Sequence, residues 1–210
     1  MAQTGLKYLV GAKIATEEYG KLPTYAEGRV IGRLITVDIS LTYGDNPLYA
    51  DNREVNNDTD FTDGSFTLTV DEFGNGKDAS DIFAVEEMLV GGFLEQGSDG
   101  SVTILHSGSS VNSAPVGIGY VKTGQAPDTY TPYYEATWYY KMRFKPQGES
   151  ASTKGGSITW TTPSLVGDIL TIDGVEPTKN LRKKARFATE AEAVAWLNEI
   201  AGITATETTG

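Results

Sequence analysis

The chain has 210 residues, contains no cysteine, is 39% hydrophobic and carries a formal net charge of −11. This length and apolar content allow a substantial core in one domain spanning residues 1–210, and the lack of cysteine excludes disulfides, thiolate nucleophiles and cysteine-bound zinc. The acidic balance argues against electrostatic binding of nucleic acid, which requires clustered Lys and Arg side chains.

The first 20 residues contain no uninterrupted apolar stretch, because Lys7 and Lys13 lie among their apolar residues. We therefore expect neither a secretory signal nor a membrane-spanning segment, and no membrane partner.

Residues 35–43 alternate apolar and polar side chains, which is typical of a strand with one solvent-exposed face. The alternation resumes at residues 65–71, so we predict that the two strands are antiparallel neighbours. Between them, residues 44–64 are predicted to form a long acidic loop. Residues 45–63 contain six acids and one arginine, which is a net charge of −5. The predicted inward face of the first strand consists of Ile35, Val37, Ile39, Leu41 and Tyr43.

Two segments have helical periodicity. Residues 78–90 have an apolar stripe, a candidate N-cap at Asp78 or Ser80, and a glycine pair after the last turn. Residues 190–201 follow a T-x-x-E capping box, formed by Thr189 and Glu192, and precede Gly202. Their apolar stripe must be buried against the sheet or against a neighbouring subunit.

Further strands are predicted at 116–120, 133–145, 156–162 and 167–172, where apolar residues alternate with others. Together these elements predict a mainly β fold: a β-sandwich or partly closed barrel of antiparallel strands, with two α-helices and extended arms. One face of the longest strand is predicted to consist of Tyr134, Ala136, Trp138, Tyr140, Met142 and Phe144.

Chemical motifs are mostly absent. His106 is the single histidine, which excludes a multi-histidine metal site, and no G-x-S-x-G turn presents a serine to it. The glycine spacing at 119–125 places Gln125 where a phosphate-binding loop needs lysine. Residues 51–63 do not fit an EF-hand, which leaves a looser calcium site on Asp58, Asp60 and Asp63 as a minor alternative. We therefore assign no catalytic, cofactor-binding or metal residue, and predict a protein that is not an enzyme.

Two surface features suggest binding. A run of tyrosines and a tryptophan across 130–140 could stack sugars, although alternation places half of it in the core. Five basic residues fall within 179–186, which suits either a solvated edge strand or a contact with the acidic loop of another copy. The predicted subunit-interface residues are Asp51, Glu54, Asp58, Asp60, Asp63, Arg182, Lys183 and Lys184.

The order and spacing of several segments resemble the major tail proteins of long-tailed, non-contractile bacteriophages. The segments are GLKYLVGAKI, LYADN, GSFTLTVDEF, PVGIGYVKTG, WYYKMRFKPQGESASTKGGSITWTTPSLVGDI and FATEAEAVAWLNEIAGI, and the resemblance extends over nearly the full length of the chain.

The resemblance implies a structural virion protein, assembled in the host cytoplasm, that forms six-subunit rings stacked into a hollow tail tube. Loop 44–64 and a flexible arm at 203–210 would then contact other copies. The implied partners are a tape-measure protein in the lumen, tail terminator and tip proteins, and passing DNA that is not specifically bound. Two alternatives are a monomeric glycan-binding β-sandwich and a tube protein of a bacterial secretion system.

Overall fold

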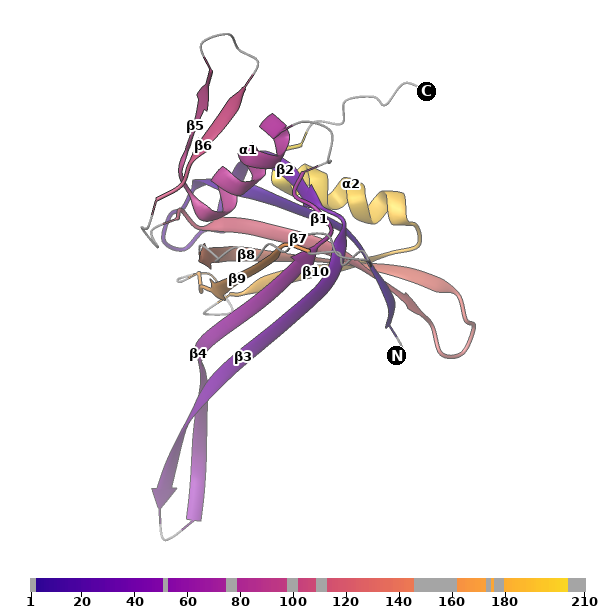
Figure 1. The fold of residues 1–210 in the computed structure, drawn as a ribbon. Coiled ribbons are helices and arrows are strands. Elements are labelled where there is room, and N and C mark those ends of the chain that lie inside the picture. The colour runs from indigo at the N-terminus through magenta and orange to yellow at the C-terminus, as the bar shows by residue number, and fades with distance from the viewer. Residues whose placement is uncertain are drawn as a thin grey trace, which may run out of the picture.

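A computed structural model describes residues 3–50, 53–74, 79–97, 102–108, 113–145, 162–172, 175 and 180–203. The fold is mainly β, with an eight-stranded antiparallel sheet, a separate two-stranded hairpin and two helices (Figure 1). The elements are β1 (Gln3–Thr16), β2 (Thr24–Gly32), β3 (Leu34–Ala50), β4 (Arg53–Val70), α1 (Ala79–Val90), β5 (Phe93–Gln96), β6 (Thr103–His106), β7 (Val116–Gln125), β8 (Pro132–Lys145), β9 (Ser164–Ile169), β10 (Arg182–Phe187) and α2 (Glu190–Ala201).

Strand β8 is the central strand of the large sheet, whose order is β2-β1-β7-β8-β9-β4-β3. One edge of β8 pairs with β7, and its other edge pairs first with β10 and then with β9. The change of partner occurs where the Tyr140 amide donates to the Leu181 carbonyl and the Leu170 amide donates to the Lys141 carbonyl. The sheet is therefore divided beside β8, with β10 on one side of the division and the β9–β4–β3 part on the other.

Two apolar clusters hold the sheet and helices together. One lies on the face covered by α1 and includes side chains of β1, β4, β7, β8 and β9. The other lies on the opposite face under α2, where Trp138, Leu197 and Ala193 are fully buried. The predicted helices at 78–90 and 190–201 are confirmed within one residue. The predicted mainly β class is also confirmed, as an antiparallel sheet whose described strands do not close into a barrel.

The predicted single face of β8 is wrong, because a β-bulge divides it. Val116 pairs with Met142 and Ile118 pairs with Tyr139, so β8 has one more residue than β7 across this interval. One extra residue reverses the side-chain alternation. Trp138 therefore packs under α2, whereas Met142 packs in the cluster on the opposite face.

A second bulge corrects the predicted inward face of β3. Leu34 pairs with Val70 and Thr36 with Thr69, so the intervening Ile35 turns outward and is 47% exposed. Leu34 takes its place against the core cluster.

The segment 44–64, predicted as a loop, is instead the outer part of a β-hairpin. Strands β3 and β4 pair from Leu34–Val70 to Ala50–Arg53 with only single-residue irregularities. The antiparallel pairing predicted for 35–43 and 65–71 is confirmed, and it continues far beyond those residues. Polar residues with low strand propensity are held in this conformation by their cross-strand partners.

Helix α2 begins and ends as the sequence predicts. The Thr189 hydroxyl accepts from the Glu192 amide, and the Glu192 carboxylate accepts from the Thr189 amide. Gly202 ends the helix with φ 70°, in the left-handed region that favours glycine. Three predicted features lie outside the described residues: the candidate N-cap Asp78, residues 156–161 of the predicted strand 156–162, and residues 204–210 of the predicted C-terminal arm. The last residue of that predicted strand, Thr162, is described and is not in a strand.

Replacing Thr189 with alanine removes one half of the capping box. We expect a loss of about 1 kcal/mol in the free energy of unfolding, because an amide of the first turn loses its acceptor. Urea unfolding followed by circular dichroism measures this loss. Thr129→Ala, in the exposed turn after β7, is the control and should change stability by less than about 0.5 kcal/mol.

Candidate functional site

The outer part of the β3–β4 hairpin, residues 41–50 and 53–64, forms a two-stranded arm. The last pairing of β4 with β9 is Ser65–Asp168, and past it β3 and β4 pair with each other and with no other described strand. Figure 1 shows the arm leading away from the body, on the side opposite α1 and α2. Each strand continues for about ten residues, which is about 30 Å at 3.3 Å per residue.

The arm is a two-stranded hairpin whose outer residues lie beyond the body of the protein. An isolated two-stranded hairpin is marginally stable in water, and its unpaired edges can accept another strand. Tyr43 and Phe61 form an edge-to-face aromatic pair with ring centroids 6.0 Å apart, and Tyr43 remains 51% exposed. This exposure corrects the prediction that Tyr43 belongs to the core face: the residue lies beyond the end of the body.

The acidic residues predicted to face a neighbouring subunit belong to this arm. Asp60 and Asp63 are exposed on β4. The backbone of Asp58 lies opposite Asn46, and that of Glu54 lies opposite Tyr49. Asp51 lies outside the described residues. The structure thus places four of the five acids on one projecting element.

The basic residues predicted as their counterpart lie on β10, but alternation divides them between two faces of the sheet. Lys183 points toward α2, where its ammonium lies 5.3 Å from the centre of the Trp196 ring. Burial lowers the Lys183 pKa, and the nearby Glu199 carboxylate opposes that shift. Lys183 is therefore occupied by an intrachain contact with the helix.

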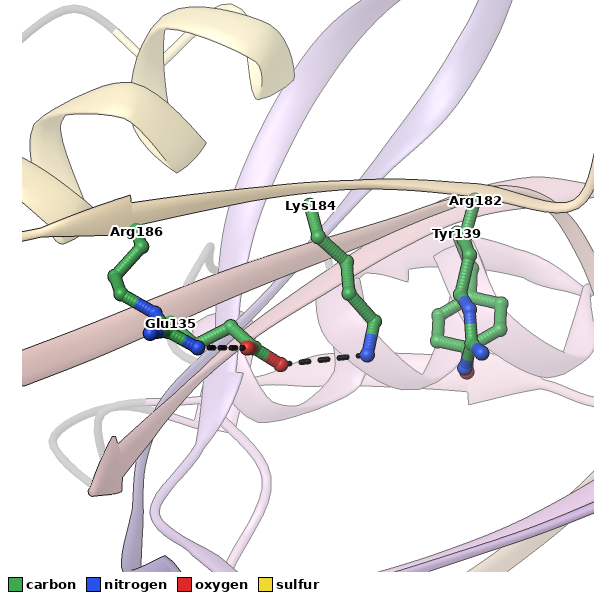
Figure 2. Close-up of polar contacts among 5 residues, drawn as sticks. All are labelled: Glu135, Tyr139, Arg182, Lys184 and Arg186. Atoms are coloured by element: carbon green, nitrogen blue, oxygen red, sulfur yellow. Dashed lines mark hydrogen bonds and ion pairs between the residues drawn. The ribbon is translucent and has the colours of Figure 1, made fainter. Parts of the chain in front are cut away.

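The other β10 cations lie on the face opposite α2 (Figure 2). Glu135 is the shared partner of two of these cations: the Lys184 ammonium is 3.3 Å from one carboxylate oxygen, and the Arg186 guanidinium is 3.6 Å from the other. Arg182 donates to the buried Tyr139 hydroxyl at 2.6 Å. Lys122 of β7 belongs to the same surface. In the strand register, Glu135 of β8 lies between Lys122 of β7 on one side and Arg186 of β10 on the other.

We call this surface the basic face, defined by Lys122, Glu135, Arg182, Lys184 and Arg186. Its four cations and one carboxylate give a net charge of +3. The electrostatics reflect this excess of positive charge. Burial lowers the Lys122 pKa most, and repulsion from Lys184 lowers it further, while Glu135 acts in the opposite direction.

Sequence reasoning missed Lys122 and Glu135 as members of this surface. Lys184 and Glu135 are 49 positions apart in the chain, and only strand register brings them together. The one available signal was alternation in 182–186, which separates Lys183 from its two neighbours.

The remaining candidates occupy other parts of the molecule. His106 is exposed on β6, pairs with Glu95 at 2.8 Å and stacks on Phe93 with ring centroids 4.4 Å apart. Its side chain borders a shallow cavity of about 340 Å³ between the end of α1 and the β5–β6 hairpin. In the tyrosine-rich strand, Trp138 and Tyr139 are fully buried, so they belong to the core and not to an exposed sugar platform.

Among the described residues, no group of three or more histidine and acidic side chains is arranged to hold a metal ion. None of the described helices has the length and apolar character needed to cross a membrane. The sequence matches no protein-family model and no curated protein.

Proposed function

We propose that this chain is a structural subunit that assembles with copies of itself into rings and stacked tubes. The observation that carries the proposal is the arm, an acidic two-stranded ribbon that leaves the body, carries the half-exposed Tyr43 and pairs with no other described strand. Such a ribbon contributes little to the core of its own copy. It gains stability when a neighbouring copy covers it.

The sequence resemblance to major tail proteins makes the proposal specific. On this basis the assembly is a phage tail tube of six-subunit rings around a tape-measure protein, bounded by terminator and tip proteins. The net charge of −11 agrees with a conduit for DNA, because an acidic wall repels phosphates and lets a duplex pass without binding. A tube protein of a bacterial secretion system would assemble through the same kind of contacts between copies.

Negative-stain electron microscopy across a concentration series, beside sedimentation velocity, tests the proposal on the intact chain. We expect rings or hollow tubes of uniform width, with a sedimentation coefficient that rises with concentration. A species that stays monomeric up to millimolar concentration contradicts the proposal. Binding of that monomer to a polysaccharide array would instead favour the glycan-binding alternative.

A further inference from the structure

We propose that the acidic arm of one copy docks on the basic face of a second copy. This inference rests on the proposed self-assembly and identifies the surface that receives the arm. The two surfaces have opposite net charges, −5 for residues 45–63 and +3 for the basic face. They lie on different parts of one chain, so the contact is heterologous and each copy can both give an arm and receive one.

The basic face is built to accept an anionic partner. It presents Arg182, Lys184 and Arg186 in a row along β10, all three exposed. The single carboxylate, Glu135, has a side chain only 18% exposed and is shared by two of them. The depressed Lys122 pKa reflects burial and crowding of like charges, so an added carboxylate would relieve electrostatic repulsion there.

The width of the basic face and the length of the arm are also compatible. The face is three strands wide, β7, β8 and β10, which is about 10 Å at ~4.8 Å between neighbouring strands. An arm of about 30 Å covers that width and keeps most of its length for other contacts. The arm leads away from its own body (Figure 1), which places the contact between copies.

A protein partner suits this face better than nucleic acid does. A nucleic acid would meet three excess positive charges on a chain whose net charge is −11, so long-range attraction is lacking. The arm carries Asp60 and Asp63, both exposed, on the single strand β4, which offers a defined pair of carboxylates to the β10 row.

Substitutions that reverse the charge of single side chains on each surface test the contact. We expect Asp60→Lys with Asp63→Lys, or Lys184→Glu alone, to raise the protein concentration needed for assembly roughly tenfold or more. Lys184→Gln should give a smaller rise, because it removes the attraction without repelling either the arm or Glu135. Matched controls are Asp128→Lys and Lys21→Glu, which change exposed charges in the turns after β7 and β1 and should assemble as wild type does.

Mixing the two reversed variants identifies the contact directly. The Lys184→Glu chain keeps a native arm, and the Asp60→Lys, Asp63→Lys chain keeps a native basic face. A heterologous contact predicts that an equimolar mixture forms a 1:1 complex by sedimentation velocity and does not grow further through this contact.

The outcomes separate this inference from the proposed function. If wild type assembles and the mixture gives no complex, then the arm docks elsewhere and only the inference is contradicted. If wild type remains monomeric, both are contradicted. If Lys184→Glu assembles normally but loses retention on heparin, the face binds a free polyanion and not the arm, and the inference is again overturned. Thermal melting of each variant confirms that it is folded.

Discussion

Deleting residues 43–62 and joining Thr42 to Asp63 through an Asn-Gly turn is expected to prevent assembly at concentrations where wild type assembles, while the body remains folded. Thr42 and Asp63 are cross-strand partners, so a two-residue turn can close the shortened hairpin in its native register. Tyr43 and Phe61 are absent from both buried clusters, and the last core contact of this part of β3 is made by Leu41. The melting temperature should therefore change by only a few degrees.

The loss of assembly should be large because the arm carries two kinds of contact. It supplies the acids expected to meet the basic face, and it presents the exposed Tyr43 and the strand edges that a neighbour would cover. We expect the concentration needed for assembly to rise by about a hundredfold or more, which corresponds to ~3 kcal/mol per contact. Electron microscopy and sedimentation velocity measure the change.

Mixing the shortened chain with wild type provides a second test. The shortened chain keeps the basic face, so it can bind the arm of a wild-type copy, but it has no arm with which to bind a further copy. Added to wild type below equimolar ratio, it should cap growing assemblies and shorten them. Unchanged length distributions, or normal assembly of the shortened chain alone, would show that the arm is not the connecting element.

Much of the body could be predicted from the sequence because local signals there agree with the tertiary structure. The Thr189–Glu192 capping box and Gly202 are local features, and they gave the bounds of α2 correctly. Alternation correctly identified β3 and β8 as strands. It failed for individual faces at the two bulges, because one inserted residue reverses the alternation and leaves no signal in composition.

The arm and the basic face were harder to predict, for different reasons. Asn56, Asn57 and Asp58 favour turns, so their pattern predicted a loop, whereas continuous pairing with 46–48 keeps them in a strand. The basic residues formed one patch in sequence, but neighbours on a strand point to opposite faces. Their carboxylate partner, Glu135, comes from another strand and follows only from register.

Trp138 joins the sheet to α2 through contacts within one chain, which is why we expect the body to fold independently of assembly. Its indole lies against Gly117 and Gly119 of β7, where an added Cβ would come within 2.5 Å of the ring at either position. On the other side it meets α2 through the cluster containing Leu197, and Tyr25 packs edge-to-face at 4.9 Å. Two glycines on one strand thus make room for a single large side chain that joins the sheet to the helix.

Replacing Trp138 with alanine should therefore cost about 3–5 kcal/mol in the free energy of unfolding, because it leaves a cavity between β7 and α2 that rigid backbone cannot fill. For a chain of this size, the loss corresponds to a fall of roughly 10 °C in the melting temperature. Trp196→Ala is the matched control: this ring is partly exposed and contacts Lys183 and Phe187, so its loss should cost about 1 kcal/mol. Equal losses for the two variants in urea unfolding would mean that α2 is held by its outer face and not by the buried indole. A large loss for Trp138→Ala alone, with the shortened-arm chain still stable, would show that folding depends on the body and that the arm is available for contacts between copies.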